Sequence, residues 1–478
     1  MPLNIFDTRL RRKVPFQSLK HNKVGMYTCG PTVYRDATIG NFRAYMFEDL
    51  LRRTLKFLGY SVKQVMNLTD VDDKTIRDAN ARGVPLKEHT APITERFFRD
   101  LDLLNIERAE VYPAATDHIQ EMIDLIQILI NKEHAYKADN SIYYRISSFP
   151  QYGQLSGMKL ECLARGVRID SDEYERDDFR DFALWKGWSE SDGDVYWDSP
   201  FGRGRPGWHI ECSAMSIKYL SEEFDIHTGG VDNIFPHHEN EVAQSVGATE
   251  KSFAKYWMHC AHLMIEGEKM SKSLGNDYVL QDLLAKGYSA RALRYVLLTT
   301  HYRQLLNFTH EGVAAATRSL ERLDTLFQVA NLAKGDSKVR VALKEEIENC
   351  RSSFVKSMED DLNISDAMAA LFNLVSSVHQ SATEMPFNKA EGVALKVFWA
   401  DVDRVLGFLI PKEEALPELV IKSVEKRMLL RKELHYKQAD EIREMLIKEG
   451  YQLEDLGNKT VVIWSGGRKI ISIDGDRS

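Results

Sequence analysis

The stretch Phe235-Pro236-His237-His238-Glu239-Asn240-Glu241 combines residue types that can bind a metal ion. Proline fits the first turn of a helix, because it has no N–H to satisfy and its φ is already helical. If a helix begins at Pro236, His237 and Glu241 are four residues apart and share one face. An imidazole and a carboxylate placed in this way make half of a tetrahedral zinc site. A polar helix start that binds no metal has the same residues, so both interpretations stay open for this stretch alone.

Two cysteines elsewhere in the chain are candidates for the other half of such a site, which two thiolates would complete. Cys29 ends the run Met26-Tyr27-Thr28-Cys29-Gly30, and Cys212 ends Trp208-His209-Ile210-Glu211-Cys212. Both cysteines are expected near strands or loops.

Two further segments have the composition of phosphate-binding sites. Ala37-Thr38-Ile39-Gly40-Asn41 places a glycine at an expected helix start, where free N–H groups and the helix dipole favour a phosphate. The run from Glu268 to Asn276 contains Lys269 and Lys272 among small residues, and two such lysines can hold a polyphosphate. An ordinary α/β turn and an ordinary solvated loop have similar compositions, so the spacing of these residues alone does not show that either segment binds phosphate.

The elements around the first of these segments predict a nucleotide-binding sheet. The apolar run Val24–Cys29 predicts a buried strand, and Ser61–Asn67 predicts a second one. Between them, apolar side chains at three- and four-residue spacing predict a helix over residues 41–58. Strand, glycine turn, helix and strand begin a parallel sheet. The run Asn67–Lys74 then comes after the second strand at its carboxyl end, where such sheets bind ligands, although a capped loop before a helix also explains it.

The remainder of the chain predicts a multidomain α/β protein. Its parts are a Rossmann-like parallel-sheet catalytic domain with an insertion of small strands, a helical bundle, and a small mixed α/β module at the C-terminus. A single helix over about 419–448 and a hairpin of 451–453 with 460–464 form the last module. The expected boundaries are 1–117 and 206–265 for the two halves of the catalytic domain, 118–205 for the insertion, 266–315 for the lysine loop and the segment after it, 316–410 for the bundle, and 411–478 for the C-terminal module.

The composition limits the classes of protein to which the chain can belong. The 478 residues include 71 acidic and 63 basic residues, for a net charge of -8, which does not indicate a nucleic-acid binder but allows local basic patches. Five cysteines, an odd number, do not indicate a disulfide framework. Residues 1–13 lack the apolar core of a signal peptide, and no uncharged stretch approaches the roughly 20 residues of a membrane span. A soluble, cytoplasmic protein without a membrane partner is expected.

Taken together, these motifs resemble the cysteinyl-tRNA synthetases of bacterial type. The most specific pieces are Cys29-Gly30-Pro31-Thr32-Val33-Tyr34, Asn67 to Lys74, Gly204 to Met215, and Phe235 to Glu241, joined by Lys269-Met270-Ser271-Lys272-Ser273. The resemblance is dense from about residue 24 to 310 and looser to about 465. It implies a class I enzyme that converts L-cysteine and ATP, with Mg²⁺, to cysteinyl-adenylate and transfers the cysteinyl group to tRNA(Cys). It also implies a monomer.

The resemblance also implies a role for each site residue. One zinc ion per chain would be held by Cys29, Cys212, His237 and Glu241 and would select the thiolate of cysteine. Lys272, with Lys269, Thr38, Gly40 and Asn41, would bind ATP and promote catalysis. Thr69 and Trp208 would line the amino-acid pocket together with Cys29. The segment after Leu274 would contact the acceptor stem, and the basic residues of the last helix, with Trp464, would reach the anticodon: Lys422, Lys426, Arg427, Arg431 and Lys432.

A zinc ion would solve a specific problem for such an enzyme. Cysteine and serine differ by one atom, and apolar pockets discriminate such pairs by only about 1–3 kcal/mol. Zinc binds a thiolate and lowers the pKa of a thiol, whereas a serine hydroxyl keeps its proton and is a poor ligand. No editing domain is then needed. The Glu241 ligand favours this use over a structural zinc site, which is more often made of Cys and His alone.

Two departures and two alternatives accompany the resemblance. The chain has Cys260-Ala261 where the family commonly has Asn-Gly, which places a thiol near the lysine loop, expected to be a small buried apolar group. The family usually has histidine where this chain has Thr38, and a threonine hydroxyl can donate to a phosphate but carries no charge. A cysteine ligase of the mycothiol pathway is similar in the catalytic half, but it lacks most of the region that this chain has after His310. A catalytically silent RNA-binding relative is the other alternative, for which Thr38 is the only indication.

Overall fold

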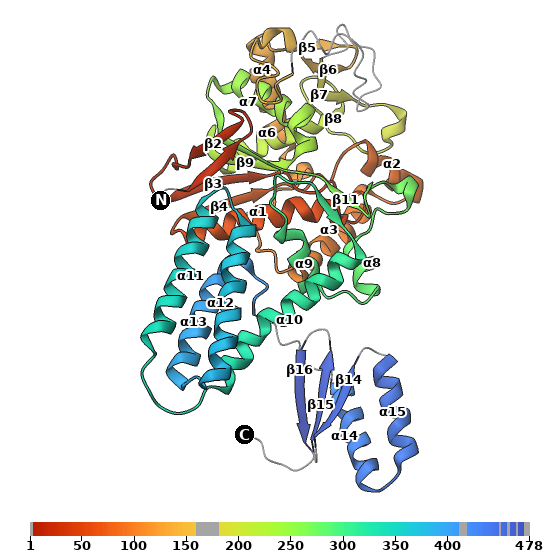
Figure 1. Cartoon of the computed structure of the whole chain (residues 1–478). Helices are drawn as coiled ribbons and strands as arrows, with labels where there is room; N and C mark the ends of the chain where they lie inside the picture. The colour runs from red at the N-terminus through yellow and green to blue at the C-terminus, as the bar shows by residue number, and fades with distance from the viewer. Residues whose placement is uncertain are drawn as a thin grey trace.

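The computed structural model describes residues 3–158, 181–410, 418–448, 451–456, 459–464 and 467–472. Its centre is a parallel four-stranded sheet in the order β10-β9-β3-β4 (Figure 1). The strands are β3 (Lys23–Thr28), β4 (Ser61–Met66), β9 (Glu223–Gly230) and β10 (Phe253–Cys260). The predicted parallel sheet and its first two strands are therefore present, each strand ending one residue earlier than expected.

Helices cover both faces of this sheet because side chains alternate along each strand. Met26 packs into the core on the side of α1 (Ile39–Phe57), whereas Tyr27 packs into the core on the opposite side. The helices of that opposite side are α4 (Ile119–Asn131), α6 (Trp208–Tyr219) and α7 (Glu239–Thr249). Helices α2 (Asp73–Arg82) and α3 (Leu86–Leu103) come after β4, and the hairpin of β1 (Asn4–Asp7) and β2 (Arg12–Pro15) precedes β3.

The insertion contains a second, antiparallel sheet in the order β5-β6-β7-β8. Its strands are β5 (Ala135–Ala138), β6 (Ser141–Tyr144), β7 (Phe182–Gly187) and β8 (Gly204–Pro206). The small strands predicted for this region are present. Gly207 links the last strand directly to α6.

The lysine loop leads from the parallel sheet to the bundle. The strands β11 (Leu263–Ile265), β12 (Glu268–Lys269) and β13 (Leu306–Phe308) flank it, with α8 (Leu280–Ala285) and α9 (Ala290–Thr299) between. Four long helices come next and pack side by side in Figure 1: α10 (His310–Leu332), α11 (Val341–Glu359), α12 (Ile364–Glu384) and α13 (Lys389–Leu406). Among the described residues, no helix has the length and apolar character that a membrane crossing requires.

The C-terminal module differs from its prediction in two respects. The single helix expected over about 419–448 is two helices, α14 (Glu418–Lys432) and α15 (Tyr436–Lys448), because the chain turns at Leu434, which has a positive φ of 65°. The expected hairpin has a third strand, so the sheet comprises β14 (Gln452–Leu456), β15 (Lys459–Trp464) and β16 (Gly467–Ser472). The module has a separate hydrophobic core, which includes Val424, Leu446 and Val462.

The basic residues of α14 do not all remain free for RNA. Arg427 is 1% exposed and forms two 2.8 Å hydrogen bonds with Asp455, and Arg431 contacts the same carboxylate. These arginines fix the helix to the sheet. Lys422, Lys426 and Lys432 are exposed, whereas the side chain of Trp464 lies outside the described residues.

Candidate active site and metal centre

The candidate site lies at the point in the parallel sheet where the strand order reverses. From the central strand β3 the chain passes through α1 to β4 on one side, and β9 lies on the other side. Open α/β sheets bind ligands at the carboxyl ends of strands at such a point. Cys29 comes directly after β3, and its N–H donates to the carbonyl of Thr228 in β9 at 3.3 Å. The first cysteine is therefore at the expected position in the sheet.

The structure brings the four predicted metal-binding residues together. One ligand atom from each of Cys29, Cys212, His237 and Glu241 lies within 4.8 Å of the others. Cys212, His237 and Glu241 are buried, and Cys29 is half-buried. Two sulfurs, one imidazole nitrogen and one carboxylate oxygen form a donor set that suits zinc.

Two local expectations about these ligands were wrong in detail. Cys212 lies on α6 and not near a strand or loop; every side chain from His209 to Ser216 is buried, so this helix shows no amphipathic pattern. The regular helix α7 begins at Glu239 and not at Pro236, after the segment Ile234–His238, which is kinked at Phe235, where the backbone is extended (φ −138°, ψ 131°). His237 and Glu241 still share a face, with 3.1 Å between Nε2 and Oε1.

The charges of the cluster suit a divalent cation. Burial opposes the ionisation of Glu241, but His227 and His237 lower its pKa to about 2. Burial likewise opposes the ionisation of Cys212, but a hydrogen bond with Cys29 and the charge of His237 lower its pKa to about 6. Burial also disfavours the charged form of His237, yet Glu241 and Cys212 raise its pKa to about 10. The carboxylate and the thiolate thus hold a proton on His237, in the place where a metal ion could be bound.

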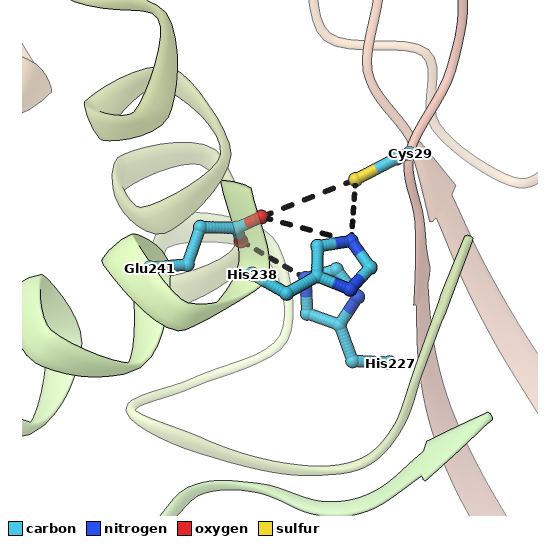
Figure 2. Close-up of side chains that lie close together, drawn as sticks. All are labelled: Cys29, His227, His238 and Glu241. Atoms are coloured by element: carbon cyan, nitrogen blue, oxygen red, sulfur yellow. Dashed lines mark hydrogen bonds and ion pairs between the residues drawn. The ribbon is translucent and has the colours of Figure 1, made fainter. Parts of the chain in front are cut away.

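Several histidines around the cluster were not predicted as site residues. His227 Nε2 lies 2.9 Å from Glu241 Oε2, and His238 Nε2 lies 3.2 Å from Cys29 Sγ (Figure 2). His259 Nε2 lies 2.8 Å from His238 Nδ1. The signal in the sequence was His227 close to two glycines, Gly229 and Gly230, which end the mostly buried strand β9.

Cys29 and Glu241 also belong to a second possible ligand set. With His227 and His238, their ligand atoms again lie within 4.8 Å of one another, as Figure 2 shows. That set has only one thiol. His237 has Nδ1 at 2.9 Å from His209 Nδ1 and directs Nε2 towards Glu241, and His238 is held in the same way by His259, so both sets contain a histidine fixed through its other nitrogen. The second thiol, that of Cys212, favours the set with Cys212 and His237, because zinc binds thiolates well.

The two predicted pocket residues lie beside the cluster. The Trp208 ring stacks on the His237 ring with 4.2 Å between centres, and Trp208 is 39% exposed, so part of its surface remains free for a ligand. Thr69 is buried and donates its hydroxyl to Glu211 Oε2 at 3.0 Å, while Asn67 Nδ2 donates to Thr69 Oγ1 at 3.1 Å. Asn67 and Glu211 lie within the quoted motifs, but the sequence did not indicate that they orient Thr69.

The two candidate phosphate segments are in contact. A Cβ added to Gly40 would lie 2.6 Å from Met270 Cε, so the lysine loop packs directly on the first turn of α1. The N–H and the hydroxyl of Thr38 both donate to Asn41 Oδ1, at 2.9 and 2.8 Å, which stabilises the start of α1. Lys269 and Lys272 are both exposed. The Lys272 ammonium nitrogen lies 5.8 Å from the centre of the Tyr34 ring.

We expect the Thr38→His variant to retain ATP-dependent activity or to raise it. The reason is that a histidine on the same turn can hydrogen-bond a phosphate and, when protonated, adds a charge that threonine lacks. The measurement is kcat/KM for ATP in pyrophosphate exchange, with Thr38→Ala as the variant that removes the hydroxyl. A folded but inactive Thr38→His protein would mean that the turn depends on the Thr38–Asn41 hydrogen bonds.

Comparison with known proteins decides the family. Residues 15–318 match the model of the class I (C) tRNA synthetase catalytic domain, and residues 353–410 match the DALR domain. The cysteine–tRNA ligase of Brachyspira hyodysenteriae is 48% identical over 94% of this chain and 97% of its own length. The chain belongs to the cysteine–tRNA ligase family. The family's enzyme from Protochlamydia amoebophila is similarly 47% identical over 95% of this chain and 96% of its own length.

Family membership makes the chain an aminoacyl-tRNA ligase, whose substrates are an amino acid, ATP and tRNA. The similarity spans the helical and C-terminal parts as well as the catalytic half. Solved structures agree on the fold: methionyl-tRNA synthetase of Mycobacterium tuberculosis is 14% identical, with a TM-score of 0.59, over 83% of this chain and 94% of that one. The predicted fold class is confirmed.

Proposed function

We propose that the chain activates L-cysteine with ATP and transfers it to tRNA(Cys), with one zinc ion bound by Cys29, Cys212, His237 and Glu241. The observation that carries this proposal is the buried cluster of two thiols, an imidazole and a carboxylate at the carboxyl end of β3. When bound there, zinc would provide a ligand position selective for the thiolate of cysteine.

Side chains of the protein itself position the cysteine substrate. Thr69, held by Asn67 and Glu211, and Trp208, stacked on His237, are the sides of the pocket beside the thiol-binding cluster. With its thiolate at the cluster, cysteine would have its carboxylate on the side of Gly40. Gly40 and Lys272 would then hold the phosphates of ATP, which binds with Mg²⁺.

Adenylate formation then requires that the protein place the cysteine carboxylate against the α-phosphate and neutralise the charge on the leaving pyrophosphate. It requires no covalent intermediate with the protein. An oxygen of the cysteine carboxylate bonds to the α-phosphorus, and the bond from that phosphorus to the bridging oxygen breaks as pyrophosphate leaves. Lys272, supported by Lys269, neutralises the charge that develops on the leaving group. A ribose hydroxyl at the tRNA end next attacks the acyl carbon and passes its proton to the phosphate of the departing AMP, which leaves with the bonding electron pair.

The parts of the chain receive roles under the same proposal. Residues 1–117 and 206–265 form the catalytic domain, 118–205 the connective insertion, and 266–315 the lysine loop with the acceptor-stem contact. Residues 316–410 form the helical bundle, and 411–478 form an anticodon-binding module. The enzyme is proposed to act as a monomer in the cytoplasm, as the resemblance implies.

Ending the chain near Pro417 is expected to leave cysteine-dependent ATP–pyrophosphate exchange near its normal rate. The reason is that, among the residues that the structure describes, the cores around the catalytic site include none from the C-terminal module, which has its own core. Charging of tRNA should fall sharply, because basic side chains position an RNA backbone and aromatic rings stack on unpaired bases.

Both reactions are measured on the full and the shortened chain with the same tRNA(Cys) transcript. Equal charging by the two proteins would remove the module from tRNA recognition. A full-length protein without cysteine-dependent exchange would contradict the proposed function itself.

A further inference from the structure

Three cationic side chains from three segments gather around the ring of Tyr34. The Lys74 ammonium nitrogen lies 5.3 Å from the ring centre and that of Lys272 lies 5.8 Å from it. The guanidinium carbon of Arg35 lies at 5.5 Å. All three distances are within the range of a cation–π interaction. The ring therefore brings Lys74, at the start of α2, close to the lysine loop.

Among the described residues, Arg35 is the only one of these three cations that forms an ion pair with a carboxylate. It forms a 2.7 Å ion pair with Asp277, which also ties the segment around Tyr34 to the lysine loop. Asp73, next to Lys74 in the sequence, pairs instead with Lys186 at 2.9 Å and with Arg205. Within the part of the chain that the structure describes, Lys74 and Lys272 form no ion pair with a carboxylate.

The position of Lys74 on its helix is unfavourable for a cation. Lys74 is the second residue of α2, whose amino end is capped by the carboxylate of Asp72. The amino end of a helix carries a partial positive charge, which repels a lysine and attracts a phosphate. Lys74 thus gains nothing from the helix dipole, although its charge attracts the neighbouring Asp72 carboxylate, and it is placed to meet an anion.

We propose that Lys74 and Lys272 together form a pyrophosphate subsite, with the Tyr34 ring holding both ammonium groups beside it; this inference rests on the proposed function. As the cysteine carboxylate bonds to the α-phosphorus, pyrophosphate takes the electron pair of the broken bond. The two ammonium groups neutralise the charge that it gains. Two cations from separate segments hold this leaving group better than Lys272 alone.

The test is the binding of inorganic pyrophosphate, with Mg²⁺, to the full-length protein by calorimetry. Lys74→Gln should raise the Kd about tenfold, the loss expected for one charge-assisted hydrogen bond, and Lys74→Arg should restore most of the affinity. Arg77→Gln is the matched control, because Arg77 lies about one turn further along α2, is exposed and pairs with Asp78. It should leave the Kd unchanged.

Two substitutions of Tyr34 test the role of its ring. Tyr34→Phe keeps the aromatic face and should bind pyrophosphate as the parent does, whereas Tyr34→Leu should bind about threefold more weakly. Equal affinity of these two variants would overturn the role of the ring.

The outcomes separate this subsite from the proposed function. Unchanged pyrophosphate affinity in Lys74→Gln, in a protein that performs cysteine-dependent exchange, overturns the subsite and leaves the function standing. Pyrophosphate binding that depends on Lys74, in a protein without cysteine-dependent exchange, supports the subsite and contradicts the function.

Discussion

Replacing Cys212 with serine is expected to remove zinc from the protein and, with it, the activation of cysteine. His237→Ala should do the same. Even the loss of an outer hydrogen-bond partner of a ligand commonly weakens metal binding about 10–100-fold, so the loss of a ligand should cost at least about a hundredfold. Elemental analysis of the purified variants, alongside pyrophosphate exchange with cysteine and with serine, measures both effects.

Cys350→Ser is the control for this experiment. Cys350 is also a buried cysteine, but it lies on α11, and its sulfur donates to the carbonyl of Ala370 within the bundle. This variant should keep one zinc per chain and full exchange activity. A zinc-free protein that still selects cysteine over serine would exclude the metal from amino-acid recognition.

The second large effect is expected for Lys272→Ala, which should slow adenylate formation about a hundredfold, since losing one preorganised charged donor costs about 3 kcal/mol of transition-state stabilisation. The affinity for cysteine should change far less, because the lysine acts on the leaving group. Single-turnover kinetics at saturating cysteine separates the two quantities.

Lys286→Ala is the matched control for a nearby lysine. Its ammonium nitrogen lies 4.1 Å from the centre of the Tyr278 ring, in the turn after α8, and its removal should leave the rate of activation unchanged. An unchanged single-turnover rate in Lys272→Ala would transfer the role to Lys269, which the same measurement on Lys269→Ala would test.

Two of the four ligand residues and the first part of the fold could be predicted from local patterns. The strand before Cys29, the helix after Gly40 and the return strand at Ser61 each result from apolar periodicity and a glycine turn, and the structure has all three. The pairing of His237 with Glu241 likewise results from a spacing of four residues. It holds even though the regular helix begins only at Glu239, because the preceding turn is already helical from Pro236.

The sequence by itself determined the first strand–helix–strand unit and the pairing of His237 with Glu241, because each depends on spacing within one segment; the full set of four ligands was implied only by the family resemblance. Only the tertiary structure decided what holds the site residues in place. His227 meets Glu241 across 14 positions, and Thr69 meets Glu211 across 142. Contacts of this kind arise when separate strands and helices pack. Local periodicity therefore could not reveal them, nor could it reveal that Arg427 pairs with Asp455 in the interior of the C-terminal module and is not free on its surface.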